Sequence, residues 1–262
     1  DESERPVIGQ IYGKDPEYFY HAAKIICALG FDGVDINMGC PARNVASSGA
    51  GAGLIRTPDL AREIIASVRQ GVKDWVENGE LSGLNEKTYT AVINQIKLQG
   101  MEGKERKELP VSVKTRIGFD KPVTEEWIKN LDRAEPDWIA VHGRTLKQMY
   151  TGLADRNELK KAVESTDLPV LMNGDIENRE DAERVVEETG AEGALIGRGS
   201  FGNPWVFNEN YIEPSFDEKI RVMIEHTEKF IELNPDPRAF FQMRKHFGWY
   251  IKNFAGAKEL RI

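Results

Sequence analysis

Short apolar stretches rich in β-branched residues recur along the chain, and each is followed by residues whose apolar positions have helical spacing. The predicted strands lie at residues 6–11, 31–39, 110–118, 137–145, 169–176 and 192–199. The predicted helices between them lie at residues 17–29, 58–70, 125–133, 156–164 and 179–189. Strands that read as apolar runs and alternate with helices indicate an α/β fold with a parallel sheet buried on both faces.

The number of predicted strands falls short of a closed barrel. A (β/α)8 TIM barrel has eight strands, and each βα unit takes about 30 residues. This pattern yields six strands, the first residue is Asp, and the first strand begins almost at once. We therefore expect a TIM barrel that lacks its first one or two βα units in this chain, or else an open barrel.

Two segments depart from the βα rhythm. Residues 71–109 form a long polar connection with a helix predicted at 86–98, and connections of this length are usually insertions. From residue 215 the alternation stops, and two amphipathic helical patterns follow. We expect a barrel domain over residues 1–214 and a small helical domain over residues 215–262.

Composition narrows the possible partners. The 262 residues are 40% hydrophobic and carry a net charge of −8. So acidic a chain does not coat nucleic acid nonspecifically, because that mode depends on counterion release at patches of Lys and Arg. Residues 215–262 hold nine Lys and Arg against seven Asp and Glu, so a local basic patch is expected there.

Apolar runs, the N-terminal residues and the cysteines indicate where the protein is expected to be located. No apolar run approaches the ~18 residues that span a bilayer, and residues 1–10 lack the features of a signal peptide. The two cysteines, Cys27 and Cys40, stand on either side of one predicted strand, which argues against a disulfide framework or a thiolate metal site. We expect a cytoplasmic protein with no bound metal, no membrane contact and no obligate protein partner.

Polar residues and glycines end the predicted strands. They are Gln10, Asn37–Cys40, Lys114, Arg116, His142, Arg144, Asn173–Asp175 and Gly197–Gly199. In a (β/α) barrel the chemistry takes place at the carboxyl ends of the strands. The pattern therefore predicts one site at the barrel mouth.

Three of these side chains suggest chemistry. A lone cysteine is more often a small buried hydrophobe, but Cys40 follows a strand end and precedes a proline, which favours a reactive role. Cys27 keeps the buried interpretation. Lys114 would be partly desolvated and could hold an anionic group, with a solvated surface lysine as the alternative. His142 has no second metal ligand at suitable spacing, so it fits a hydrogen bond to a ligand or a core histidine.

Glycine-rich segments point to a phosphate ligand. The segment GRGSFGNPW (197–205) places backbone N–H groups at a turn beside Arg198, and NGDI (173–176) supplies a second turn. The segment SSGAGAGL (47–54) lacks the G-x-G-x-x-G spacing, so no dinucleotide site is expected there. The stretch MRKHFGWYIK (243–252) could stack on RNA bases or belong to a helical core.

The motifs DINMGCPARNV, VKTRIG, VHGRT, NGDI, IGRGSFGNPW and MRKHFGWYIKNFAGAKELR occur in this order along the chain. In order and spacing they resemble the tRNA-dihydrouridine synthase family from about residue 6 to 261, apart from the insertion. The resemblance implies an FMN-dependent oxidoreductase that uses NADPH or NADH to reduce a uridine in tRNA to 5,6-dihydrouridine.

The resemblance also implies roles for individual residues. FMN would contact Gln10, Lys114, His142, Asn173, Gly174, Asp175, Gly197 and Arg198. Cys40 would be the catalytic acid that protonates carbon 5 of the uracil after hydride reaches carbon 6, and Asn37 would orient the ring. Arg43, Arg116 and Arg144, with Lys147, would contact the tRNA substrate.

Two other functions stay open at this point. One is an FMN-dependent barrel reductase of a small pyrimidine, which would not need the helical tail. The other is a tRNA-binding chaperone without redox turnover.

Overall fold

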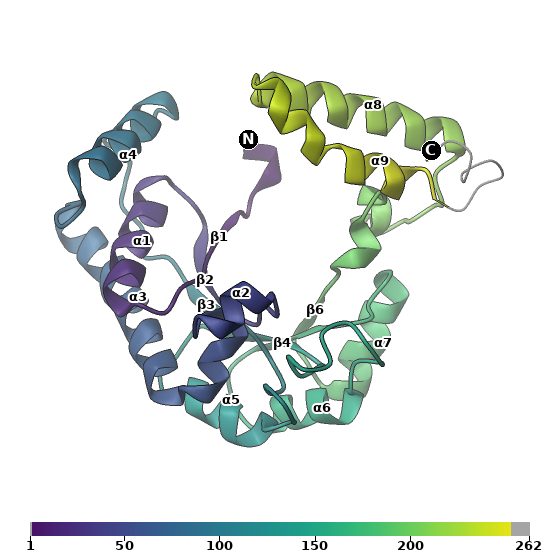
Figure 1. Cartoon of the computed structure of the whole chain (residues 1–262), viewed down its shortest axis with the longest axis horizontal. Helices are drawn as coiled ribbons and strands as arrows, with labels where there is room; N and C mark the ends of the chain where they lie inside the picture. The colour runs from purple at the N-terminus through teal and green to yellow at the C-terminus, as the bar shows by residue number, and fades with distance from the viewer. Residues whose placement is uncertain (1, 253–262) are drawn as a thin grey trace. The chain divides into compact units, whose positions relative to one another are not determined.

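The computed structural model describes residues 2–252 and contains one six-stranded sheet, whose strands follow one another in chain order (Figure 1). The strands are β1 (Ile8–Ile11), β2 (Gly33–Met38), β3 (Val111–Arg116), β4 (Trp138–His142), β5 (Val170–Asn173) and β6 (Gly193–Leu195). The pairings from β1 to β5 are parallel. Each strand lies within a predicted stretch, so the predicted α/β architecture with a parallel sheet is confirmed.

Helices separate the strands and cover one face of the sheet (Figure 1). The helices between the strands are α1 (Pro16–Ala28), α2 (Arg43–Ser47), α3 (Pro58–Asn78), α4 (Glu86–Leu98), α5 (Thr124–Asp132), α6 (Arg156–Glu164) and α7 (Arg179–Thr189), and α8 (Phe216–Leu233) and α9 (Arg244–Tyr250) follow the last strand. Short 3-10 helices are η1 (Glu2–Glu4), η2 (Gly51–Arg56), η3 (Arg198–Ser200), η4 (Pro204–Phe207) and η5 (Pro237–Gln242). No helix in residues 2–252 is both long and apolar enough to cross a membrane.

The two faces of the sheet differ in polarity. Alternate residues of a strand point to opposite faces, and Val34, Ile36 and Met38 are fully buried on the helix side. Thr115, which pairs with Met38, shares that side, because its hydroxyl accepts a hydrogen bond from Trp127 of α5. The opposite face is also largely buried but carries polar side chains. Those at the strand ends were predicted, whereas Asp35 and Ser112 inside the strands were not.

Helix α3 extends beyond its predicted end at residue 70. Apolar contacts continue at Val72 and Trp75, three residues apart, so helical packing persists to Asn78. Gly71 permits close contact with α1, because a Cβ there would lie 2.5 Å from the carbonyl oxygen of Tyr20. Gly79, with a φ of 67°, ends the helix. Residues 71–78 of the predicted connection are therefore helical.

Helix α4 confirms the helix predicted within the insertion. Its Val92 packs with Leu81 and with Ala28 of α1 in a small apolar cluster. Asn85 caps the helix by accepting a hydrogen bond from the backbone N–H of Thr88. The insertion is thus anchored to the outer helix layer.

The chain forms two compact units. The first holds the residues up to Asp175 together with Val185–Ala194, and the second holds Ile176–Arg184 and the described residues from Leu195 onward. Helices α8 and α9 in the second unit confirm the two amphipathic patterns after residue 215. Residues 253–262 of the predicted helical domain lie outside the described range, and the boundary at residue 214 stays a prediction.

Candidate active site

Polar side chains line the second face of the sheet in the first unit. Asn37 and Lys114 are neighbours across β2 and β3, and His142 and Asn173 are neighbours across β4 and β5. Residues that are paired across parallel strands point to the same face. The sheet therefore brings together side chains that the sequence places more than a hundred residues apart.

Hydrogen bonds connect the ends of β1 and β2. Asp35 accepts from the hydroxyl of Ser112 at 2.7 Å and from Nε2 of Gln10 at 2.6 Å. Asn37 donates from Nδ2 to Oε1 of Gln10 at 2.9 Å. These contacts fix the orientation of both amide side chains. Sequence reasoning missed Asp35 and Ser112, although they stand two residues before Asn37 and Lys114 and so share their face.

Asn37 also holds the segment that carries Cys40. Its Oδ1 accepts hydrogen bonds from the backbone N–H groups of Gly39 at 3.1 Å and Cys40 at 2.8 Å. Cys40 lies just beyond β2 and is half-buried. The residue expected to donate a proton is therefore positioned by the residue expected to orient the substrate.

The glycines of SSGAGAGL have a packing role beside Cys40. A Cβ on Gly51 would lie 3.0 Å from the Cβ of Cys40, and the φ of Gly51 is 56°. A Cβ on Gly53 would lie 2.7 Å from the carbonyl oxygen of Ala46. Gly51 thus lets η2 pass close to Cys40, and Gly53 lets it pass close to Ala46. That these glycines form no dinucleotide site stays a prediction.

Lys114 lies among these side chains with limited access to solvent. Its ammonium nitrogen is 3.2 Å from Oδ1 of Asn173 on β5. Burial lowers the pKa of Lys114, and the nearby charge of Asp35 offsets this only in part. A desolvated cation at this place suits an electron-rich or anionic ligand.

His142 is neutral at physiological pH. Burial, followed by the positive charges of Arg116, Lys114 and Arg144, lowers its pKa to about 3. Its Nε2 is 3.2 Å from Nη1 of Arg144. Because a guanidinium only donates hydrogen bonds, Nε2 must be the acceptor, and the proton of the neutral ring is then on Nδ1.

The buried Arg144 forms an ion pair with Asp175, whose side chain is partly exposed. Nη2 of Arg144 lies 2.7 Å from each carboxylate oxygen of Asp175 and 2.7 Å from the carbonyl oxygen of Gly152. Only 2% of Arg144 is exposed. Asp175 also accepts a hydrogen bond from the N–H of Ala154. Gly174 lets the chain turn here, because a Cβ would lie 2.7 Å from the ring of His142.

The expected substrate contacts divide into exposed and buried residues. Arg43, at the start of α2, and Lys147, after β4, are exposed. Arg116 is only 3% exposed, and its guanidinium donates to the carbonyl oxygens of Gly39, Thr145 and Met149. The assignment of Arg116 and Arg144 to the tRNA stays a prediction.

The GRGSFGNPW segment belongs to the second unit. Gly197 and Arg198 are exposed, and a Cβ on Gly197 would have no atom within 4 Å. Gly199 and Gly202 are different, since a Cβ on either would lie within 2.4 Å of backbone atoms of Glu177 or Trp249. Packing thus accounts for two of the three glycines and leaves Gly197 beside open space.

The aromatic residues near the C-terminus pack within the second unit. Trp249 stacks on Phe201 with ring centroids 4.1 Å apart. Tyr250 is buried, and its hydroxyl oxygen lies 3.3 Å from Nδ1 of His226. Arg244 and Lys245 of α9 are exposed. In this stretch the aromatic residues contribute to a core, and the basic residues reach the surface.

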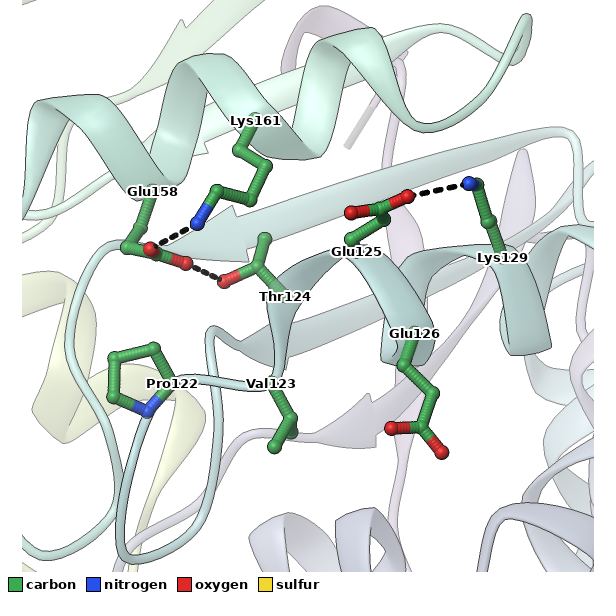
Figure 2. A pocket seen from close by; sticks show the side chains of 8 residues that line it. All are labelled: Pro122, Val123, Thr124, Glu125, Glu126, Lys129, Glu158 and Lys161. Atoms are coloured by element: carbon green, nitrogen blue, oxygen red, sulfur yellow. Dashed lines mark hydrogen bonds and ion pairs between the residues drawn. The ribbon is translucent and has the colours of Figure 1, made fainter.

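Figure 2 shows a separate pocket between the starts of α5 and α6. Its charges are largely paired, with Lys161 on Glu158 at 2.5 Å and Lys129 on Glu125 at 2.6 Å. The hydroxyl of Thr124 also donates to Glu158. None of the expected site residues lines this pocket. Within the described part of the chain, no group of His, Cys, Asp and Glu could hold a metal ion.

The sequence matches the family described as Dihydrouridine synthase (Dus) over residues 1–78 and 94–262. It is 32% identical over 272 residues to the probable tRNA-dihydrouridine synthase 1 of Synechocystis sp., which covers 100% of this chain and 66% of that protein. It is 32% identical over 263 residues to tRNA-dihydrouridine synthase B of Pseudomonas putida, which covers 96% of this chain and 68% of that protein. The chain spans about two thirds of the length of these curated relatives.

Among solved structures, DHODH of Eimeria tenella in complex with ferulenol matches with a TM-score of 0.45 and 15% identity. The match covers 72% of this chain and 51% of that one. Similarity at this level establishes no shared function. The family match also omits residues 79–93, which hold the turn after α3 and the first half of α4.

Proposed function

Because this chain belongs to the dihydrouridine synthase family, we propose that it reduces a uridine of tRNA to 5,6-dihydrouridine. The observation that carries the proposal is the arrangement of Cys40. Its backbone N–H is bound by the Asn37 side chain at the end of β2, on the face that also carries Lys114. A thiol held next to a polar, partly desolvated strand end suits proton transfer to a bound ring.

The residues at the strand ends fit an FMN cofactor. Lys114 is a desolvated cation whose burial an anionic or electron-rich ring would compensate. Gly197 faces open space beside the exposed Arg198, as a phosphate contact requires. The residues that would hold FMN are Gln10, Lys114, His142, Asn173, Gly174, Asp175, Gly197 and Arg198. Bound FMN, reduced by NADPH or NADH, would supply a hydride to carbon 6 of the uracil.

The chain's own residues would complete the reduction. The Cys40 thiol donates its proton to carbon 5, so it acts as an acid and not as a covalent nucleophile, and it must be protonated before the transfer. Asn37 donates one amide hydrogen to Gln10, and we assign its other amide hydrogen to a uracil carbonyl. The neutral imidazole of His142 can donate from Nδ1 without adding charge.

Exposed cations would hold the tRNA. Arg43 and Lys147 lie on segments that follow β2 and β4, the strands that carry Asn37 and His142. Both could contact phosphates, and the binding would be local and sensitive to salt because the chain as a whole is acidic. Under this proposal the partner is tRNA and the reaction takes place in the cytoplasm.

The product of the reaction tests this function directly. The purified protein is incubated with FMN, NADPH and a tRNA transcript that contains no modified bases, and the nucleosides are analysed by mass spectrometry. We expect a uridine that has gained two hydrogens. Unchanged tRNA together with reduction of free uracil would favour a small-pyrimidine reductase, and tRNA binding without any reduction would favour a chaperone.

A further inference from the structure

Arg116 stands between two loops that follow different strands. Its Nε donates to the carbonyl oxygen of Gly39 at 2.8 Å, in the segment after β2. Its Nη1 donates to the carbonyl oxygens of Thr145 and Met149, at 3.1 and 3.2 Å, in the segment after β4. One guanidinium thus connects the Cys40 segment to the segment 145–149.

The bond to Gly39 acts on the peptide group that leads into Cys40. The carbonyl oxygen of Gly39 and the N–H of Cys40 belong to the same planar unit. Arg116 binds the oxygen at 2.8 Å, and Oδ1 of Asn37 binds the N–H at 2.8 Å. A peptide plane that is held on both sides cannot rotate, and its orientation sets the direction in which the Cys40 side chain leaves the backbone.

The surroundings of Gly39 remove other freedom. A Cβ there would lie 3.2 to 3.3 Å from the backbone of Thr115, so the segment lies close against β3. On the other side, Gly51 of η2 lies against Cys40. Asn37 and Arg116 are the two residues whose side chains form hydrogen bonds with this peptide group.

Burying the charged guanidinium of Arg116 against three neutral carbonyl oxygens costs free energy. Burial lowers the pKa of Arg116, and the adjacent Arg144 lowers it further, while Tyr150 and Cys40 favour the charged form. A residue that only filled space would not need this charge. The planar guanidinium can reach three carbonyl oxygens in fixed directions, which a lysine ammonium on a flexible chain cannot do.

The second loop presents its side chains outward. Tyr150 is 59% exposed, Met149 is 43% exposed and has a φ of 50°, and Leu153 is 81% exposed. Arg144 holds the far end of this loop through the carbonyl of Gly152. Two buried arginines therefore fix a loop whose apolar side chains point away from the core.

We propose that Arg116 is a positioning residue that orients the Cys40 peptide and couples it to the 145–149 segment. The proposal rests on the proposed function for the meaning of Cys40 as the proton donor. For Arg116 this role would replace the tRNA contact expected from the sequence, because its guanidinium donates to backbone carbonyl oxygens.

The test compares Arg116→Met and Arg116→Lys with the wild type and with Arg69→Met, which replaces a partly exposed arginine on α3 that is ion-paired with Asp137. Hydrogen exchange is measured over residues 38–42 and 145–150. Stopped-flow absorbance measures flavin reduction by NADPH and reoxidation by tRNA separately. We expect faster exchange in both segments for both Arg116 variants and in neither segment for Arg69→Met.

The kinetic expectation is specific to positioning. Reoxidation by tRNA should slow about 10- to 100-fold in both Arg116 variants, because a small misplacement of an acid is costly. Flavin content, flavin reduction and the KM for tRNA should change less than about threefold. The proposal would be overturned if Arg116→Lys reoxidised its flavin at the wild-type rate, or if the variants lost only affinity for tRNA. Unchanged hydrogen exchange in both segments would also overturn it.

The two proposals can fail independently. If the wild type does not reduce tRNA, the proposed function fails, while hydrogen exchange still decides whether Arg116 holds the two segments. If Arg116→Met does not fold, Arg116→Lys carries the comparison, because it keeps the charge and most of the volume.

Discussion

The side chain of Asn37 accepts hydrogen bonds from two consecutive backbone N–H groups and donates one to Gln10. Its amide plane is therefore fixed, and Cys40 is fixed with it. Gln10 is held in turn by Asp35, which also binds Ser112. The geometry of the proposed acid depends on this connected set of polar residues across β1, β2 and β3.

Replacement of Cys40 by alanine tests its role as the proton donor. We expect Cys40→Ala to lower the rate of tRNA reduction at least about 100-fold, since loss of a positioned acid typically costs this much. Flavin reduction by NADPH should keep its wild-type rate, because the thiol takes no part in that step. Equal slowing of both steps would instead indicate that Cys40 supports cofactor binding. Cys27→Ala is the control, since Cys27 lies in α1 and burial raises its pKa to about 12.

His142 should make stability depend on pH. Its pKa is about 3 in the folded protein, against 6.5 as its ordinary value, so the unfolded chain binds the proton first. Stability from this residue is complete above about pH 6.5 and falls as the pH drops towards 3, by about 1.4 kcal/mol per unit. Urea midpoints of the protein without cofactor, at about pH 7.5 and about pH 5, measure the effect.

His142→Gln provides the comparison, because glutamine keeps an acceptor for Arg144 but does not titrate in this range. We expect the variant to lose less stability than the wild type between the two pH values, by about 2 kcal/mol. Identical losses in the two proteins would contradict a buried neutral His142.

Only some of the polar residues on this face of the sheet could be predicted from the sequence. That Gln10, Asn37, Lys114 and Asn173 lie together could be predicted because each stands at or near the end of a recognisable strand. Asp35 and Ser112 were missed because they stand inside strands that read as apolar runs. The burial of Arg116 and Arg144 could not be foreseen, since their carbonyl and carboxylate partners come from loops whose paths the sequence does not specify.

At the scale of elements, helix α6 depends on its N-terminal cap. Asp155 accepts hydrogen bonds from the backbone N–H groups of Asn157 at 3.0 Å and Glu158 at 3.1 Å. We expect Asp155→Ala to lower the free energy of unfolding by about 1 kcal/mol, and Asp155→Asn, which retains a capping oxygen, to lower it by only a few tenths. Chemical denaturation measures both variants, and equal losses would show that the cap is not the cause.

The positions of the strands and longer helices could be predicted from the sequence because their apolar patterns extend over many residues and their capping residues are recognisable. Helix α6 occupies its predicted range, and each of the six strands lies within its predicted stretch. Helices α2 and η2 were not predicted, since both are short and the glycines of η2 resemble a loop. Their conformation depends on close packing beside Cys40, which is a tertiary effect and leaves no periodic signal.

At the scale of the whole molecule, the proposed function requires an acidic chain to bind an acidic partner. The net charge is −8, so under the proposed function tRNA binding depends on a few exposed cations such as Arg43 and Lys147. We expect the logarithm of the tRNA binding constant to fall with the logarithm of salt with a slope of roughly −2 to −3. Fluorescence anisotropy across a salt series measures this slope, and a slope near zero or steeper than about −7 would contradict local contacts.

The most direct test of the central claim is an absorbance measurement made without oxygen on the purified protein with FMN. We expect the near-ultraviolet and blue bands of bound flavin, their loss on addition of NADPH, and their return when tRNA without dihydrouridine is added. A tRNA whose target uridine is already dihydrouridine should not restore the flavin bands. A protein that binds no flavin even after reconstitution with FMN, or a reduced flavin that tRNA does not reoxidise, would contradict the assignment of this chain as a tRNA-dihydrouridine synthase.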